Sequence, residues 1–222
     1  RDIGVITFSE AGWRVSERLR SYLPCRLFVH ESLHVESSGV ERFARVRDLL
    51  NIHFRSLACW VMIAPCGVAV RALAPLIRDK YSDPAVLVVD VGARHVISLL
   101  SGHEGGANLY AVGIANILGA EPVITTTTET VKSWIAGIGC RRGVSYAAIA
   151  AALRQALRQA NICSEDVRFL ATAWRRKEEP GLLELSRSWN IPLRYFPDFM
   201  MRQMAHRVAM STWVQEKIGL PA

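Results

Sequence analysis

Residues 85–119 read AVLVVDVGARHVISLLSGHEGGANLYAVGIANILG, and this stretch decides the fold class. Its two apolar runs, 85–90 and 95–100, have the length of buried strands and are joined only by VGAR. A parallel crossover needs a dozen residues or more, so we expect these runs to pair as an antiparallel hairpin. SGHEGG then opens a predicted helix over 107–118 that ends at Gly119. The region therefore predicts a mixed sheet packed against helices.

The flanking sequence continues this α/β pattern on both sides. Apolar runs of strand length alternate with stretches of helical periodicity, and Ser145 is placed to cap a helix. We expect two three-layer α/β/α domains, with a mixed sheet in residues 1–130 and a small, mainly parallel sheet in residues 131–222. The further predicted strands are 3–8, 57–64, 122–127, 134–139, 167–172 and 193–196. The further predicted helices are one that carries Val15, Leu19 and Tyr22 after the loop at 9–12, and those at 68–77, 146–160 and 181–189.

The composition indicates an ordinary folded protein. Half of the 222 residues are hydrophobic and 21% are charged, which argues against disorder. No apolar run reaches the roughly 18–20 residues of a membrane span, and the N-terminal RDIGVITFSE lacks the pattern of a signal peptide. The 5 cysteines are scattered without a C-x-x-C, so neither a zinc site nor a disulfide framework is predicted. Reduced thiols and a cytoplasmic location are expected.

The net charge of +7 favours an anionic partner, which could be nucleic acid, acidic lipid, or a small polycarboxylate or phosphate. Sheets that bind nucleic acid carry aromatic side chains interleaved with basic ones on their strands, and the sequence lacks this pattern. GIGCRRG also departs from the dinucleotide fingerprint, because Arg142 stands where the third glycine should be. We expect no nucleic-acid partner, and a phosphate or nucleotide binder stays as a third hypothesis.

Four glycine-containing loops, FSEAG, APCGVAVR, LSGHEGGAN and GIGCRRG, follow predicted strands. Ligands of open α/β sheets gather where strands end and helices begin, so we expect these loops to form one anion-facing edge. The alternative is that each glycine only permits a tight turn or close packing. The predicted substrate-binding residues are Gly67, Arg71, Ser101, Gly102, Gly105, Gly106, Asn108, Gly139, Cys140, Arg141 and Arg142.

His103 and Glu104 are the predicted catalytic residues. A neutral imidazole at His103 could activate water while the amides of Gly105 and Gly106 hold a developing oxyanion, a division of labour that suits acyl or lactone hydrolysis. Glu104 could orient His103 or act as the base itself. In the alternative, the histidine only caps the helix or bonds a carbonyl, and the glutamate complements the helix dipole.

Arginines in these loops are candidates for binding carboxylates. Arg71, Arg141 and Arg142 could each form bidentate pairs with a carboxylate, although a solvated surface role is the alternative. Cys140 could be activated by the neighbouring arginines, but without a histidine partner in the sequence a structural cysteine is favoured. The RRK run at 175–177 is expected to be an exposed basic loop.

These loops carry a resemblance to a known family. The motifs resemble both terminal regions of the CbiG family of cobalamin biosynthesis, the cobalt-precorrin-5A hydrolases. In that family an intervening region separates the Thr-rich strand from the GIGCRRG strand, whereas here Thr130 meets Val131, and the chain stops at GLPA before the usual closing segment. The matching stretches are APCGVAVRALAPLIRDKYSDPAVLVVD, VISLLSGHEGGAN, EPVITTTTET, GIGCRRG and LATAWRRKEEPGLLELSRSWNIPLRYF.

The resemblance implies a hydrolase of the anaerobic vitamin B12 pathway. Such an enzyme opens the δ-lactone of cobalt-precorrin-5A, releases acetaldehyde and forms cobalt-precorrin-5B. It needs no cofactor, and the only metal is the cobalt carried by the tetrapyrrole substrate. The alternative is a non-catalytic protein that binds and hands over a tetrapyrrole of the same pathway. Two kinds of protein partner stay open, a second copy of the chain or neighbouring enzymes of the pathway.

Overall fold

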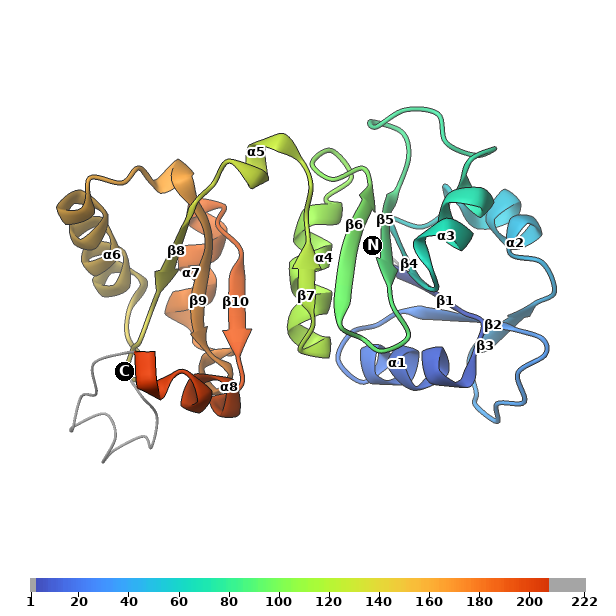
Figure 1. Cartoon of the computed structure of the whole chain (residues 1–222), viewed down its shortest axis with the longest axis horizontal. Helices are drawn as coiled ribbons and strands as arrows, with labels where there is room; N and C mark the ends of the chain where they lie inside the picture. Colours follow the sequence, from blue (N-terminus) through green and yellow to red (C-terminus); the bar gives the residue numbers. More distant parts are fainter. Residues whose placement is uncertain (1–2, 208–222) are drawn as a thin grey trace. The chain divides into compact units, whose positions relative to one another are not determined.

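The computed structural model describes residues 3–207. The chain divides into two compact units, Arg1–Thr126 and Thr127–Ala222, each with its own sheet (Figure 1). We refer to them as unit 1 and unit 2. Both units combine strands with covering helices, as the α/β patterning of the sequence predicts.

Unit 1 contains a seven-stranded sheet in the order β3-β2-β1-β4-β5-β6-β7. Every neighbouring pair is parallel except β5 and β6, which are antiparallel, so the predicted hairpin and mixed sheet are confirmed. The strands are β1 (Ile3–Thr7), β2 (Arg26–His30), β3 (Val40–Phe43), β4 (Cys59–Ile63), β5 (Ala85–Val89), β6 (His95–Leu100) and β7 (Glu121–Val123).

Helices cover both faces of this sheet. α1 (Glu10–Arg20) and α4 (Ala107–Leu118) pack on the face that carries Val5, Val61 and Leu87. α2 (Val46–His53) and α3 (Cys66–Leu73) pack on the opposite face, against Ile6, Met62 and Val88. Successive residues of a strand point to opposite faces, so these fully apolar strands fill both cores.

Parts of unit 1 differ from the sequence-based expectations. No element was predicted between residues 23 and 56, where β2, β3 and α2 lie. The predicted strand 122–127 is wrong beyond Val123, because Thr127–Thr130 form the short helix α5. α3 begins at Cys66 rather than at residue 68, and it ends at Leu73. It stops two residues before Pro75, because proline has no backbone N–H to donate to a helical hydrogen bond.

Unit 2 contains a three-stranded parallel sheet in the order β10-β9-β8, which confirms the small parallel sheet. Ser145 accepts a hydrogen bond from the Ala148 amide and caps α6, as expected. Leu153, Leu170 and Leu182 lie in the core between the sheet and its helices. The elements are β8 (Trp134–Gly137), α6 (Tyr146–Ala160), η1 (Ser164–Asp166), β9 (Val167–Ala173), η2 (Trp174–Arg176), α7 (Pro180–Trp189), β10 (Leu193–Phe196), α8 (Asp198–Gln203) and η3 (Ala205–Arg207).

None of the helices within residues 3–207 combines the length and the apolar character that crossing a bilayer requires.

Candidate functional site

The loops of unit 1 that were expected to share one edge of the sheet lie at two opposite edges. β1 and β4 are parallel and end at the same edge, so the loops that follow Thr7 and Ile63 lie there. β6 runs the other way, since Leu100 pairs with Val86 at the start of β5. The 101–106 loop therefore lies at the opposite edge, and the expectation of a single edge is wrong. In Figure 1 this loop and the 78–84 loop lie at the upper end of the sheet.

The edge at the ends of β1 and β4 brings Gly67 and Arg71 together. It is the switch point of the sheet, where the strand order changes direction between β1 and β4, and ligands of such sheets commonly bind there. Arg71 Nη1 donates to the Gly67 carbonyl oxygen at 2.9 Å, and both residues are exposed. A Cβ on Gly67 would lie 3.2 Å from Arg71 Nη1, so the glycine makes room for the guanidinium group.

The 101–106 loop at the other edge is closed by its own hydrogen bonds. Buried Ser101 adopts a left-handed backbone (φ 57°), and its carbonyl oxygen accepts the Gly105 amide at 3.1 Å. The Gly106 amide donates to the His103 carbonyl oxygen at 3.1 Å. Both amides that were predicted to stabilise an oxyanion already have acceptors. The oxyanion role of these amides stays a prediction, which this conformation of the loop does not support.

Crowding within the chain explains why this loop needs glycine. A Cβ on Gly102 would lie 2.8 Å from Thr126 Cγ2, and one on Gly105 would lie 2.6 Å from Ser101 Cβ. Asn108 is buried and accepts from Ser98 Oγ at 2.8 Å while donating to Thr126 Oγ1 at 2.9 Å. These contacts favour the packing alternative over clearance for a ligand. Gly102, Gly105 and Asn108 stay predictions as binding residues, without support from the geometry.

His103 and Glu104 are the exposed side chains of the 101–106 loop. Lys80 Nζ lies 2.7 Å from Glu104 Oε1, and this hydrogen bond lowers the pKa of the Glu104 carboxyl below its ordinary value. A carboxylate with a lowered pKa is a weaker base. Glu104 is therefore suited to stabilising positive charge on the neighbouring His103 rather than to taking a proton from water.

The 78–84 loop braces this edge through residues that the sequence analysis missed. Asp83 is 3% exposed and its carboxylate lies 2.9 Å from Arg55 Nη2, while the Arg78 amide donates to its other oxygen at 2.7 Å. Ser101 Oγ donates to the Asp83 carbonyl oxygen at 3.0 Å. The polar run RDKYSD before β5 was a sequence indication of such a structured turn.

Unit 2 presents a different kind of edge. All three strands are parallel, so the loops that follow them lie at the same edge. Among residues 3–207, no atom beyond the adjoining residues lies within 4 Å of a Cβ built on Gly139 or Gly143, and Gly143 has a left-handed backbone (φ 73°). Arg141 and Arg142 between these glycines are exposed. Within the described part of the chain, the glycines of the 138–145 loop are therefore less crowded than Gly102 and Gly105 of the 101–106 loop.

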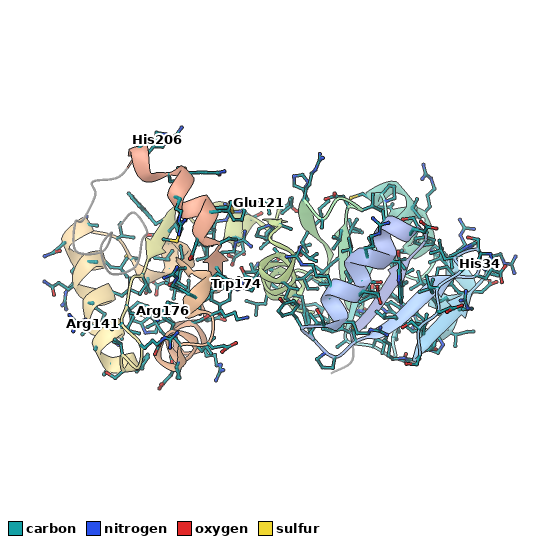
Figure 2. All side chains as sticks on the ribbon, turned by 90° about the horizontal axis from the view of Figure 1, so that it is seen from below. His34, Glu121, Arg141, Trp174, Arg176 and His206 are labelled. Atoms are coloured by element: carbon teal, nitrogen blue, oxygen red, sulfur yellow. The ribbon has the colours of Figure 1, made fainter. Side chains whose placement is uncertain are left out.

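The RRK run contributes to the same edge of unit 2. It follows β9 directly, and Lys177 Nζ lies 4.7 Å from the centre of the Trp174 ring. Arg175 forms an ion pair with Asp198 at the start of α8. Figure 2 shows Arg141, Trp174 and Arg176 in this unit. The sequence predicts only an exposed basic loop for this run, because nothing local indicates that β8 and β9 are neighbours.

Cys140 lies half-buried in this basic edge. Burial raises the pKa of the Cys140 thiol, the nearby carboxylate of Glu179 raises it further, and Arg176 lowers it. A thiol with a raised pKa is mostly protonated near neutral pH and is a poor nucleophile. This environment fits the structural cysteine that was favoured over an activated one.

Both units are similar in sequence to proteins of cobalamin synthesis. Residues 48–129 match the family model described as cobalamin synthesis G N-terminal, and residues 134–222 match the one described as cobalamin synthesis G C-terminus. A cobalt-precorrin-5A hydrolase from Salmonella typhimurium is 25% identical over 315 residues, which cover 98% of this chain and 88% of the relative. The chain has 222 residues, so part of that alignment has no counterpart here.

A second relative matches a shorter stretch at higher identity. The cobalt-precorrin-5A hydrolase from Priestia megaterium is 46% identical over 99 residues, which cover 44% of this chain and 26% of the relative. Among solved structures, a cobalamin biosynthesis protein G homolog from Sulfolobus solfataricus has a TM-score of 0.44 at 17% identity. That match covers 95% of this chain and 83% of the homolog.

Proposed function

This chain belongs to the CbiG family of cobalamin synthesis, and we propose that it hydrolyses cobalt-precorrin-5A. The observation that carries the proposal is that models of both family regions match successive parts of the chain, and a curated hydrolase of that name aligns with 98% of it. Water opens the δ-lactone of the substrate to a carboxylate and a hydroxyl. The hydroxyl then loses its proton and becomes the carbonyl group of acetaldehyde as the C–C bond between the two-carbon unit and the ring breaks, and the ring carbon takes up a proton. The product is cobalt-precorrin-5B.

We assign substrate binding to the edge of unit 2 that carries the 138–145 loop. A cobalt-precorrin carries several acetate and propionate carboxylates around its ring, and guanidinium groups bind carboxylates through paired hydrogen bonds. Exposed Arg141 and Arg142 lie between Gly139 and Gly143, which meet no close neighbour among residues 3–207, and Arg176 follows the neighbouring strand. We assign these three residues to the carboxylates. Gly67 and Arg71 form a separate candidate at the switch point of unit 1.

The catalytic role stays with His103. In this proposal its imidazole takes a proton from the attacking water, and the ionised carboxylate of Glu104 stabilises the imidazolium that results. The exposure of His103 and the Lys80 pairing of Glu104 support this division of roles. No amide of the loop is assigned to the oxyanion.

The test is acetaldehyde release from cobalt-precorrin-5A by the full chain. We expect the His103→Ala variant to lose activity by about 100-fold or more, the usual contribution of a general base. His34→Ala is the matched control, because His34 is also an exposed histidine of unit 1 but lies between β2 and β3 (Figure 2). Wild-type activity in His103→Ala would remove its role. Binding of the substrate without any acetaldehyde would support the handover protein instead.

The remaining functional assignments are proposals that follow from the same family relationship. We expect no cofactor beyond the cobalt that the substrate carries, a cytoplasmic location and no nucleic-acid partner. A second copy of the chain and neighbouring pathway enzymes are the candidate protein partners. Sedimentation of the purified chain at several concentrations distinguishes a dimer from a monomer that meets other enzymes only transiently.

A further inference from the structure

A buried glutamate, Glu179, lies beside the 138–145 loop of unit 2. Glu179 is 7% exposed and occupies the N-cap position of α7. Its main chain is held on both sides, since its amide donates to the Arg176 carbonyl oxygen at 3.0 Å and its own carbonyl accepts the Leu182 amide at 3.1 Å. Removing a carboxylate from water costs free energy unless hydrogen bonds or charges compensate it, so a buried one needs partners.

The Glu179 carboxylate is directed at the 138–145 loop. Its Oε1 accepts the Gly143 amide at 2.8 Å, although the two residues are 36 positions apart in the chain. Gly143 is the left-handed residue at which the loop turns toward α6, directly after Arg142. The hydrogen bond therefore holds the backbone at the point that determines where the two arginines lie.

A second contact fixes the same turn from the same helix. A Cβ on Gly181 would lie 2.4 Å from the Val144 carbonyl oxygen and 3.0 Å from the Tyr146 amide nitrogen. The first turn of α7 is therefore in close contact with the end of the loop. Glu179 and Gly181 together hold residues 143–146 against α7, while Arg141 and Arg142 just before them are exposed.

We propose that Glu179 is a positioning residue for carboxylate binding, which fixes the Gly143 turn and thereby orients Arg141 and Arg142 toward the substrate. This inference rests on the proposed function for the identity of the ligand. Glu179 is too deeply buried to be assigned a contact with the substrate itself. Its influence passes through the backbone of the loop.

Two substitutions distinguish the hydrogen bond that Glu179 accepts from the negative charge that it carries. A glutamine keeps a side-chain oxygen that can accept the Gly143 amide, whereas an alanine leaves that amide without the acceptor. Loss of orientation should weaken binding of the carboxylates without altering the reacting groups. We therefore expect KM and the dissociation constant to rise while kcat changes little.

The experiment compares Glu179→Ala and Glu179→Gln in the full chain. Glu178→Ala is the matched control, because Glu178 is the preceding residue with the same charge and its side chain is 88% exposed. The binding probe is a cobalt corrinoid with free side-chain carboxylates, followed by visible absorbance, and the same ring with amidated side chains serves as the reference. KM and kcat come from acetaldehyde release.

We expect Glu179→Ala to weaken binding of the free-carboxylate corrinoid by about tenfold, which corresponds to the loss of about one hydrogen bond. KM should rise similarly with kcat within about twofold, and Glu179→Gln should recover most of the affinity. Glu178→Ala should match the wild type. Circular dichroism establishes that each variant is folded, and if Glu179→Ala unfolds, Glu179→Asp replaces it, because the shorter side chain withdraws from Gly143.

Unchanged binding in a folded Glu179→Ala or Glu179→Asp variant would overturn the inference. A wild-type chain that does not prefer the free-carboxylate corrinoid would also overturn it. If the wild type shows this preference and the variant loses it, but no acetaldehyde appears, the hydrolase proposal fails while the role of Glu179 stands. The two conclusions are thus separated by independent readouts.

Discussion

The two kinds of glycine loop should respond oppositely to the same substitution. In Gly105→Ala the new Cβ would lie 2.6 Å from Ser101 Cβ, 3.0 Å from the Ser101 carbonyl oxygen and 3.1 Å from the Ala85 amide nitrogen. Two of these neighbours are backbone atoms, so they cannot yield by a change of rotamer. Overpacking of this kind typically costs about 1–3 kcal/mol of unfolding free energy. For a unit of this size we expect a loss of Tm on the order of 5–10 °C.

In Gly139→Ala the new Cβ meets no atom of residues 3–207 within 4 Å beyond the adjoining residues, and Gly139 is not among the glycines with a left-handed backbone. The unfolded chain loses conformational freedom when glycine becomes alanine, so stability should stay level or rise by up to about 1 kcal/mol. Because the methyl group projects where we propose that the ligand approaches, corrinoid binding should weaken by about tenfold.

Thermal unfolding followed by circular dichroism, together with corrinoid titration, measures both effects on the full chain. The reasoning is refuted if Gly105→Ala melts with the wild type, since the crowding at that loop would then be absent. It is equally refuted if Gly139→Ala loses stability, because the space around that residue would then be occupied.

Two further outcomes follow from the electrostatics and burial of unit 1. Removing the ammonium group in Lys80→Ala should raise the pKa of Glu104 toward its ordinary value, which an NMR titration of the carboxyl carbon measures; an unchanged titration would mean that the ion pair does not persist in solution. Burial raises the pKa of Cys59 to about 12, so iodoacetamide at neutral pH should alkylate exposed Cys66 in the native chain and leave Cys59 unmodified until the chain is denatured. Equal labelling of both thiols would contradict the burial of β4.

The local pattern of the sequence was sufficient for many individual elements. The short VGAR connection predicts the antiparallel pair β5–β6, and Ser145 and Gly119 mark the ends of helices that the structure contains. These features depend on residues that are neighbours in the chain. The stretch 23–56 was not assigned, because β2, β3 and α2 are short and only partly apolar.

The arrangement of the candidate site required information that the local pattern does not contain. In the correctly predicted hairpin, β6 runs antiparallel to β4 and β5. The loop after β6 therefore lies at the opposite edge of the sheet from the loop after β4, which separates His103 from Arg71. Glycines in two loops look alike in the sequence, yet Gly105 is crowded, whereas Gly139 has no such close neighbour among the residues that the structure describes. Glu179 could not be found from the sequence, since its partner Gly143 is distant in the chain.

The Glu179–Gly143 contact should also make the 138–145 loop, which we propose binds the substrate, one of the last parts of unit 2 to reach its final conformation. The loop emerges first during synthesis, but the carboxylate that holds its turn belongs to a helix that follows β9. A nascent chain that ends before residue 179 lacks that carboxylate. Bringing residues 143 and 179 together also costs conformational entropy of the segment between them, and only the packing of the complete unit 2 offsets this cost. Affinity for the substrate should therefore arise together with the docking of α7, so that incomplete chains do not sequester a reactive intermediate.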